Sequence, residues 1–285
     1  MSGKSWSAKR ACAAVCCLLW AGVIFAHSDH DVEIDQLGHQ LEESSATDTD
    51  ALSLLLRRAD LHRQQAHWQA ALADYRAVER IQVDNQRMLL GTAQLYMDQR
   101  EFLAASQWSE RLLSIESDHI QALLVQARAQ TGLGNPQRAT DTFARAIKLM
   151  ETPTPEHFLE HAQIVLQTSK ENAAAEAIAI VDAGASRLGH PVSLHSFALE
   201  RELEQGQELA AVERIEKVLA RYPVLLLWQL HKAELLLSLQ RADEACLTLK
   251  NVENKLQQLP PQRGKSRAMQ AVSASAAQLQ LSCSG

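Results

Sequence analysis

Alanine recurs along this chain at a spacing that is typical of a stack of similar structural units. One series is separated by 34, 34, 38, 34 and 34 residues: Ala71, Ala105, Ala139, Ala177, Ala211 and Ala245. A second alanine precedes most members of this series, usually by twelve residues: Ala59, Ala93, Ala127, Ala162 and Ala233. The fifth unit has Leu199 at this place, or Ala198 if its register shifts by one residue. Self-similarity at a nearly fixed period predicts a repeat protein in which each unit packs against the next.

Each unit contains two short stretches in which apolar residues recur at three- and four-residue steps, the pattern of an amphipathic helix. A break separates the two stretches, and Gly134 and Gly206 in these breaks suit a helix end that needs a left-handed residue. Paired alanines let two helix axes approach to about 8–10 Å. The sequence therefore predicts an all-α fold of helix hairpins.

These units resemble tetratricopeptide repeats, of an exported bacterial type. Tyr96 and Pro223 occupy the aromatic and proline positions of that family's pattern. The resemblance implies a right-handed superhelical solenoid of stacked helix hairpins, with about six repeats and capping helices. The expected repeats are 52–85, 86–119, 120–154, 155–191, 192–225 and 226–259. The fourth carries an insertion around 168–173, where a kink or looser packing is expected.

The flanking segments resemble caps. Residues 27–51 hold one short amphipathic piece, followed by a polar linker. Residues 260–285 begin with two prolines and continue into a final helix and tail, expected to turn Met269, Val272, Ala276 and Leu279 inward. Terminal units of a repeat array need polar-backed caps of this kind.

The first 26 residues resemble a secretory signal peptide. Lys4, Lys9 and Arg10 precede an apolar run from residue 11 to residue 26, which is short for a membrane-spanning helix of about 20 residues. We therefore expect an exported protein, periplasmic or secreted, although an uncleaved anchor is an alternative. Without these three of its 28 basic residues, the chain has 25 basic against 34 acidic residues, a balance of −9. This charge disfavours nucleic acid, and any membrane association beyond the export signal.

Two cysteines, Cys246 and Cys283, lie outside the signal segment. Two cysteines in a chain of this length form no disulfide framework. A bridge between them is compatible with an oxidising compartment, but nothing in the sequence argues for it.

Four histidines are weak candidates for a metal site. His157 and His161 flank Glu160 in an H-x-x-E-H pattern, and His27 and His30 lie close together after the apolar run. No third ligand accompanies the first pair, and the repeat pattern accounts for His161 as a polar helix position. The sequence contains no P-loop, no G-x-G-x-x-G and no G-x-S-x-G. We therefore expect no enzyme, no catalytic residue, no cofactor and no metal, with a metal-handling factor that uses these histidines as an alternative function.

The resemblance also implies where a partner would bind, because the first helix of each tetratricopeptide repeat lines a concave groove. The corresponding positions are Leu56, Asp60, Arg63, Arg87, Leu90, Gln94, Leu124, Arg128, Leu159, Gln163, Glu200, Glu204, Leu230 and Glu234. The leucines would form an apolar stripe that takes an extended segment or an amphipathic helix of another polypeptide. Alternatively, they pack adjacent repeats together. The prediction is a non-catalytic protein–protein interaction scaffold, with a structural assembly subunit as a further alternative.

Overall fold

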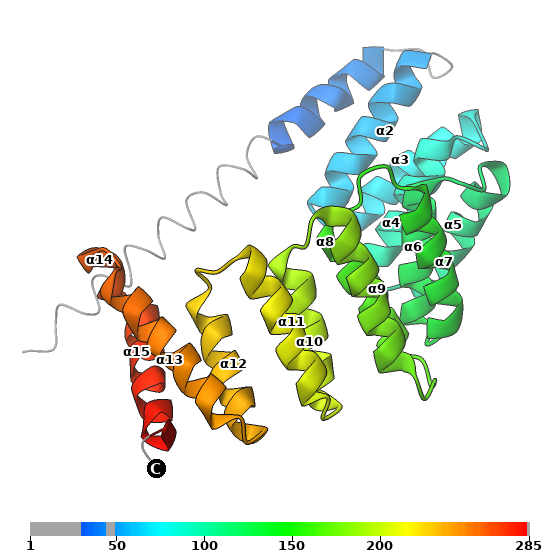
Figure 1. Ribbon diagram of the computed structural model, residues 1–285. Coiled ribbons are helices and arrows are strands. Elements are labelled where there is room, and N and C mark those ends of the chain that lie inside the picture. The colour runs from blue at the N-terminus through cyan, green and yellow to red at the C-terminus, as the bar shows by residue number, and fades with distance from the viewer. Residues whose placement is uncertain (1–29, 44–48, 284–285) are drawn as a thin grey trace, which may run out of the picture. The chain divides into compact units, whose positions relative to one another are not determined.

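The computed structural model describes residues 30–43 and 49–283, and it contains only helices and turns in this part of the chain (Figure 1). Residues 1–26, expected to be a signal peptide, and His27 lie outside the described residues. The chain divides into two compact units, one ending at Met150 and the other beginning at Glu151. The division falls close to the expected boundary between the third and fourth repeats.

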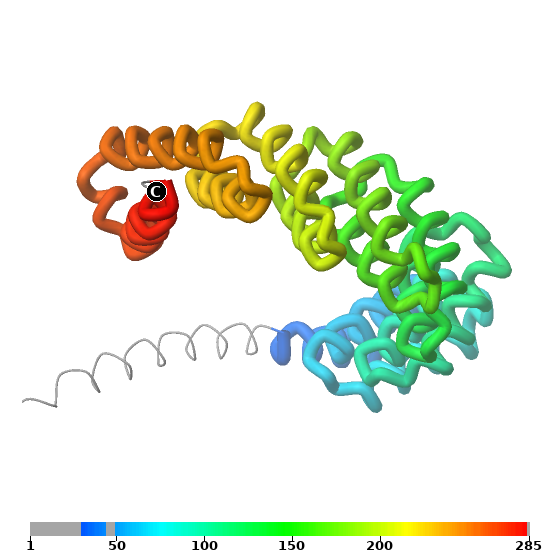
Figure 2. Tube along the Cα trace, turned by 60° about the horizontal axis from the view of Figure 1, so that its bottom comes forward, coloured from blue at the N-terminus to red at the C-terminus, as the bar shows by residue number. Residues whose placement is uncertain are grey.

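The first unit consists of a helical segment over residues 30–43 and three helix hairpins. The hairpin helices are α2 (Thr49–Gln64) and α3 (Trp68–Ile81), α4 (Gln86–Asp98) and α5 (Phe102–Ile115), and α6 (Ile120–Gly132) and α7 (Pro136–Leu149). Within each hairpin the two helices pack together, and the first helices α2, α4 and α6 also pack in sequence (Figure 2). Leu37 of the segment 30–43 is buried, as expected of a cap.

The second unit consists of three further hairpins and a C-terminal cap. Its helices are α8 (Pro155–Leu166), α9 (Ala173–Leu188), α10 (Val192–Glu204), α11 (Glu208–Arg221), α12 (Leu226–Ser238), α13 (Ala242–Gln257), α14 (Pro261–Gly264) and α15 (Arg267–Gln280), followed by the 3-10 turn η1 (Leu281–Cys283). The predicted all-α fold of stacked helix hairpins is confirmed.

The alanines that set the sequence period are the points of closest helix packing. All twelve have an exposed fraction of 0%, namely Ala59, Ala71, Ala93, Ala105, Ala127, Ala139, Ala162, Ala177, Ala198, Ala211, Ala233 and Ala245. In the fifth unit the position belongs to Ala198, so the register does shift by one residue. A methyl side chain at these contacts lets the helices approach closely without leaving a void.

The turns inside five of the six hairpins reuse one backbone conformation. The left-handed region is occupied by Ala66, Arg100, Gly134, Gly206 and Gln240, with φ between 59° and 75°. The prediction for the two glycines is confirmed. The other three residues carry a Cβ in a region that disfavours it.

The fourth hairpin connects α8 to α9 through the insertion. Here Thr168 is buried, and its hydroxyl donates a hydrogen bond to the carbonyl oxygen of Val165 at 2.7 Å. The ring of Phe158 lies directly on Gly184, where a Cβ would come within 2.4 Å of a ring carbon. This aromatic–glycine contact brings α8 and α9 together, so the looser packing expected around 168–173 does not extend to the two helices.

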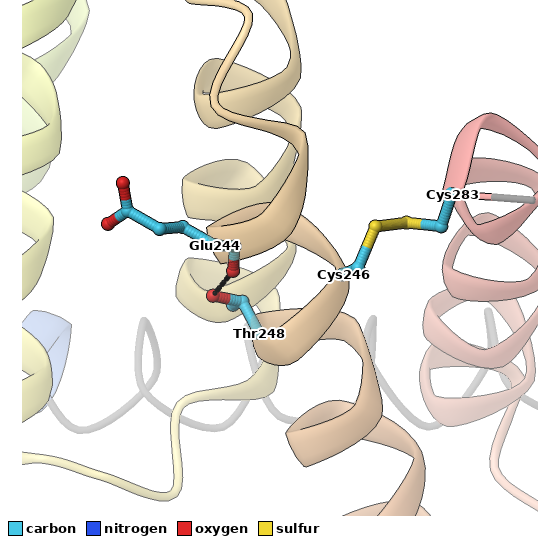
Figure 3. The surroundings of a disulfide bond; sticks show 4 residues. All are labelled: Glu244, Cys246, Thr248 and Cys283. Atoms are coloured by element: carbon cyan, nitrogen blue, oxygen red, sulfur yellow. Dashed lines mark hydrogen bonds between the residues drawn. A yellow bond between two sulfur atoms is a disulfide. The ribbon is translucent and has the colours of Figure 1, made fainter. Parts of the chain in front are cut away.

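The C-terminal cap is covalently joined to the last hairpin. Val272 and Ala276 of α15 are buried, while Met269 and Leu279 pack against the same core, as predicted. Cys246 of α13 forms a disulfide with Cys283 of η1, with their Cα atoms 5.7 Å apart (Figure 3). The bridge, which the sequence left open, anchors the end of the described chain.

Within the described chain, every helix is too short or too polar to cross a lipid bilayer.

Candidate functional site

The candidate partner surface of the first unit is built by equivalent positions on α2, α4 and α6. We call it the first-helix face and define it by Asp60, Arg63, Arg87, Leu90, Gln94 and Arg128. Because α2 packs against α4 and α4 against α6, these positions lie on one side of the unit. Arg87 and Arg128 are exposed, and Leu90 and Gln94 are half-buried.

Ion pairs between neighbouring repeats position the charges of this face. Asp60 on α2 accepts a hydrogen bond from the Arg87 guanidinium on α4 at 2.7 Å, and another from the Tyr75 hydroxyl at 2.6 Å. Arg63 on α2 pairs with Asp98 at the end of α4 at 2.6 Å. Burial is the largest influence on the pKa of Arg63 and lowers it, but the hydrogen bonds and charges of Asp98 and Tyr75 together outweigh burial and raise that pKa. Arg63 therefore stays charged at any pH that the fold survives.

The leucines predicted to form an apolar stripe are mostly part of the core. Leu56, Leu124 and Leu230 have exposed fractions of 6%, 3% and 2%. Only Leu90 in the first unit and Leu159 in the second keep part of their surface accessible. The stripe prediction is therefore wrong for the three buried residues, and the alternative that they pack helices together is the one the structure favours. A helical period places a leucine on a face, but neighbouring helices decide whether that face is covered.

The second unit carries the remaining candidate positions on α8, α10 and α12. Gln163 and Glu234 are exposed. Glu200 and Glu204 both lie against Arg201, at 2.9 and 2.7 Å, and are themselves exposed. The charges of these two predicted groove residues are therefore partly neutralised within α10.

We compared both the sequence and the structure with those of known proteins. No family model and no curated protein matches the sequence. The structure is similar to that of a tetratricopeptide repeat protein from Parabacteroides merdae, with a TM-score of 0.53 and 18% identity over 91% of this chain and 97% of the other. The chain has the tetratricopeptide repeat fold. A chain in the structure of Naa15/Naa10 bound to HypK-THB is similar over 85% of this chain and 39% of its own length, with a TM-score of 0.51 and 13% identity. The resemblance seen in the sequence is thus confirmed at the level of the fold.

The two histidines of α8 have structural surroundings in the repeat: one caps the helix and the other is buried. The Nδ1 atom of His157 accepts a hydrogen bond from the backbone amide of Thr154 at 3.0 Å, which caps the start of the helix. His161 is buried at 7% exposure. Across residues 30–43 and 49–283, no three histidine, cysteine, aspartate or glutamate side chains are grouped as a metal site would need. His30 lies in the helical segment 30–43, and its predicted neighbour His27 is outside the described residues.

Two features of the second unit were missed by the sequence analysis. One is a buried charge cluster, in which Arg214 of α11 bonds both oxygens of Glu202 on α10 and both oxygens of Asp182 on α9. The other is a cavity of about 560 Å³ beside it, lined by His190, His195, Lys217, Val218, Ala220, Arg221 and Tyr222. The helical period gave no signal for either, because both depend on which polar side chains meet in space and not on the spacing of the repeats.

Proposed function

We propose that this protein is a non-catalytic scaffold that binds a segment of another polypeptide on its first-helix face. The carrying observation is a row of polar side chains on three consecutive first helices, half-buried on α2 and exposed at Arg87 and Arg128, around a partly accessible leucine. Arg87 and Arg128 offer charged hydrogen-bond donors, Gln94 offers an amide, and Leu90 offers apolar surface. Mixed surfaces of this kind suit an extended peptide or one face of an amphipathic helix.

The fold is consistent with this role. Its helices present rows of side chains from successive repeats, and extended surfaces of repeat proteins are widely used for binding. A similar chain occurs in the structure of Naa15/Naa10 bound to HypK-THB, an assembly of several polypeptides. That likeness concerns the fold and leaves the identity of the present partner to experiment.

We also propose that the protein works outside the reducing cytosol. The apolar run from residue 11 to residue 26 with its basic start supports export. The disulfide between Cys246 and Cys283 supports it independently, because such bonds persist in oxidising compartments. Reducing and non-reducing mass measurement of the protein from periplasmic and cytosolic fractions would test this proposal.

Site-specific photocrosslinking in the native cell tests the partner-binding proposal. A photoreactive benzophenone amino acid replaces Gln94 on α4 in one variant and Gln107 on α5 in the matched control. Both are glutamines, but Gln107 is exposed on a second helix. We expect a discrete adduct from position 94 that the Arg128→Glu substitution weakens, and none from position 107.

Equal adducts from both positions, or none from position 94, would contradict the proposal. Substitution of Leu124 by glutamate is unsuitable as a binding-defective control, because that side chain is buried and a charge there would unfold the repeat.

A further inference from the structure

The cavity of the second unit lies where the turn between α9 and α10 meets α11. We call it the α11 cavity and define it by its lining residues, His190, His195, Lys217, Val218, Ala220, Arg221 and Tyr222. Its volume of about 560 Å³ is within the range of about 300–1,000 Å³ common for small-molecule sites. It does not include any residue of the first-helix face.

In the second and third repeats this place contains an ion pair. In each, an arginine on the second helix pairs with an aspartate in the turn before the first helix. Arg111 lies 3.4 Å from Asp84, and Arg145 lies 2.5 Å from Asp118. The arginine follows the second alanine of its repeat by six residues, and the aspartate precedes the first helix by two.

The fifth repeat keeps the cation of this pair but not the carboxylate. Lys217 follows Ala211 by six residues, and His190 precedes the start of α10 by two. Counted from the start of the first helix, a histidine thus stands where the second and third repeats have an aspartate. Within the described part of the chain, no carboxylate forms an ion pair with Lys217.

Two further substitutions add hydrogen-bond donors at the same place. Arg221 stands where the first three repeats carry Ile81, Ile115 and Leu149. His195 precedes Ala198 by three residues, where the second and third repeats carry the half-buried Leu90 and the buried Leu124. The lining residues include no acid, so Lys217 and Arg221 give the cavity a net positive charge. The nearby carboxylate of Asp182 is engaged by Arg214, at 2.5 and 3.0 Å.

The contact between His195 and Arg214 favours one tautomer of the neutral imidazole ring. Its Nδ1 atom lies 3.4 Å from Nη1 of Arg214. A guanidinium only donates, so Nδ1 accepts and the neutral ring carries its proton on Nε2. Burial, and then the charge of Arg214, lower the pKa of His195 and favour this neutral form. The ring stacks on His190 with centroids 5.5 Å apart, which gives the cavity a flat wall.

We propose that the α11 cavity binds an organic anion, a carboxylate or phosphate group carried on a flat apolar body. Lys217 and Arg221 hold the charged group, in place of the aspartate that the second and third repeats supply internally. Val218, Ala220 and the stacked imidazole rings contact the apolar body. The site is independent of the first-helix face and of the polypeptide that binds there.

Calorimetric titration of the purified mature protein with benzoate and with phenyl phosphate tests this proposal, with benzyl alcohol as the uncharged analogue. We expect saturable 1:1 binding of at least one anion and none of benzyl alcohol. A preference between the two anions distinguishes a carboxylate from a phosphate ligand. Lys217→Gln and Arg221→Gln should each weaken binding by about tenfold or more, because each removes a charge-assisted contact.

Two variants make the test specific. Lys250→Gln removes an exposed cation from α13 and should leave binding unchanged. His190→Asp restores the carboxylate of the second and third repeats and should abolish binding while both cations remain. It preserves the backbone, because His190 has a φ of 63° and aspartate tolerates that region better than most residues. The proposal is overturned if neither anion binds saturably at concentrations on the order of 10 mM, or if benzyl alcohol binds as well as the anions. It is also overturned if Lys250→Gln weakens anion binding as much as Lys217→Gln does, or if His190→Asp binds the anions as well as the unsubstituted protein.

Discussion

The two units of this molecule share one repeat but place their charges differently. In the first unit, arginines at partly exposed positions bridge neighbouring repeats, as in the pairs Arg63–Asp98 and Arg87–Asp60. In the second unit, a single arginine, Arg214, lies inside with an exposed side-chain fraction of 10%. The first unit also has a pair with a buried carboxylate, Arg58–Asp74, but there the arginine is 25% exposed, so the more deeply buried arginine lies in the second unit.

This difference predicts which substitutions of charged residues should lower the stability of each unit. Exposed ion pairs are screened by water and salt and contribute about 0–1 kcal/mol each, so losing one changes little. A buried cluster contributes less net stability than its contacts suggest, but removing one partner leaves an uncompensated charge and is expensive. Loss of Arg214 should therefore destabilise the second unit more than loss of an exposed arginine destabilises the first.

Replacement of Arg214 should produce the largest effect. Arg214→Met leaves Glu202, which has an exposed side-chain fraction of 6%, without its partner. We expect the free energy of unfolding of the second unit to fall by about 4 kcal/mol. The matched change in the first unit, Arg111→Met, should cost less than about 1 kcal/mol, since the side chains of Arg111 and its partner Glu79 are each 31% exposed. Denaturant unfolding followed by hydrogen exchange of each unit would measure both losses, and equal losses would refute the distinction.

Removal of the disulfide should cause the second-largest loss of stability, and this loss should again be confined to the second unit. The bond joins residues 37 positions apart, and closing a loop of this size lowers the entropy of the unfolded chain by an amount equivalent to about 3–4 kcal/mol. We expect the double variant Cys246→Ser, Cys283→Ser to lose protection in α15 first, by hydrogen exchange. The first unit, which serves as the internal control, should keep its protection. Unchanged exchange in α15 would show that the core contacts of Val272 and Ala276 suffice.

Substitutions at the left-handed turn residues should change the stability of the two units in the same way. Arg100→Gly in the first unit and Gln240→Gly in the second should each stabilise by about 1 kcal/mol, because glycine adopts positive φ without strain. Gly134→Ala and Gly206→Ala should have the opposite effect. No atom lies within 4 Å of a Cβ at either glycine, so the loss would come from the backbone alone. Thermal unfolding of the four variants would measure these changes, and effects of different sign in the two units would contradict them.

The sequence predicted the alanine contacts because they depend on a local property, the need for a small side chain where helices approach. It could not separate the buried Leu124 from the accessible Leu90, since both occupy the same repeat position and differ only in what covers them. The pairing of Cys246 with Cys283 depends on α15 folding back against α13, which no local pattern specifies. The α11 cavity is visible in the sequence only after Asp84 and Asp118 are known to form ion pairs, because His190 then stands out as the exception.

Acidification should have the smallest effect and should act on both units. Burial lowers the pKa of His62 in the first unit and of His195 in the second below the ordinary value of 6.5. Below pH 6.5 the unfolded chain binds more protons than the folded chain, so the free energy of unfolding decreases as the pH falls through this range. Unfolding should therefore be measured at pH 7.5 and pH 5.5, above the range in which carboxylates titrate. We expect His62→Gln to reduce the pH dependence of the first unit alone and His195→Gln that of the second alone. A gain of stability at the lower pH, or a variant that acts on the opposite unit, would show that these two rings are not the groups that titrate.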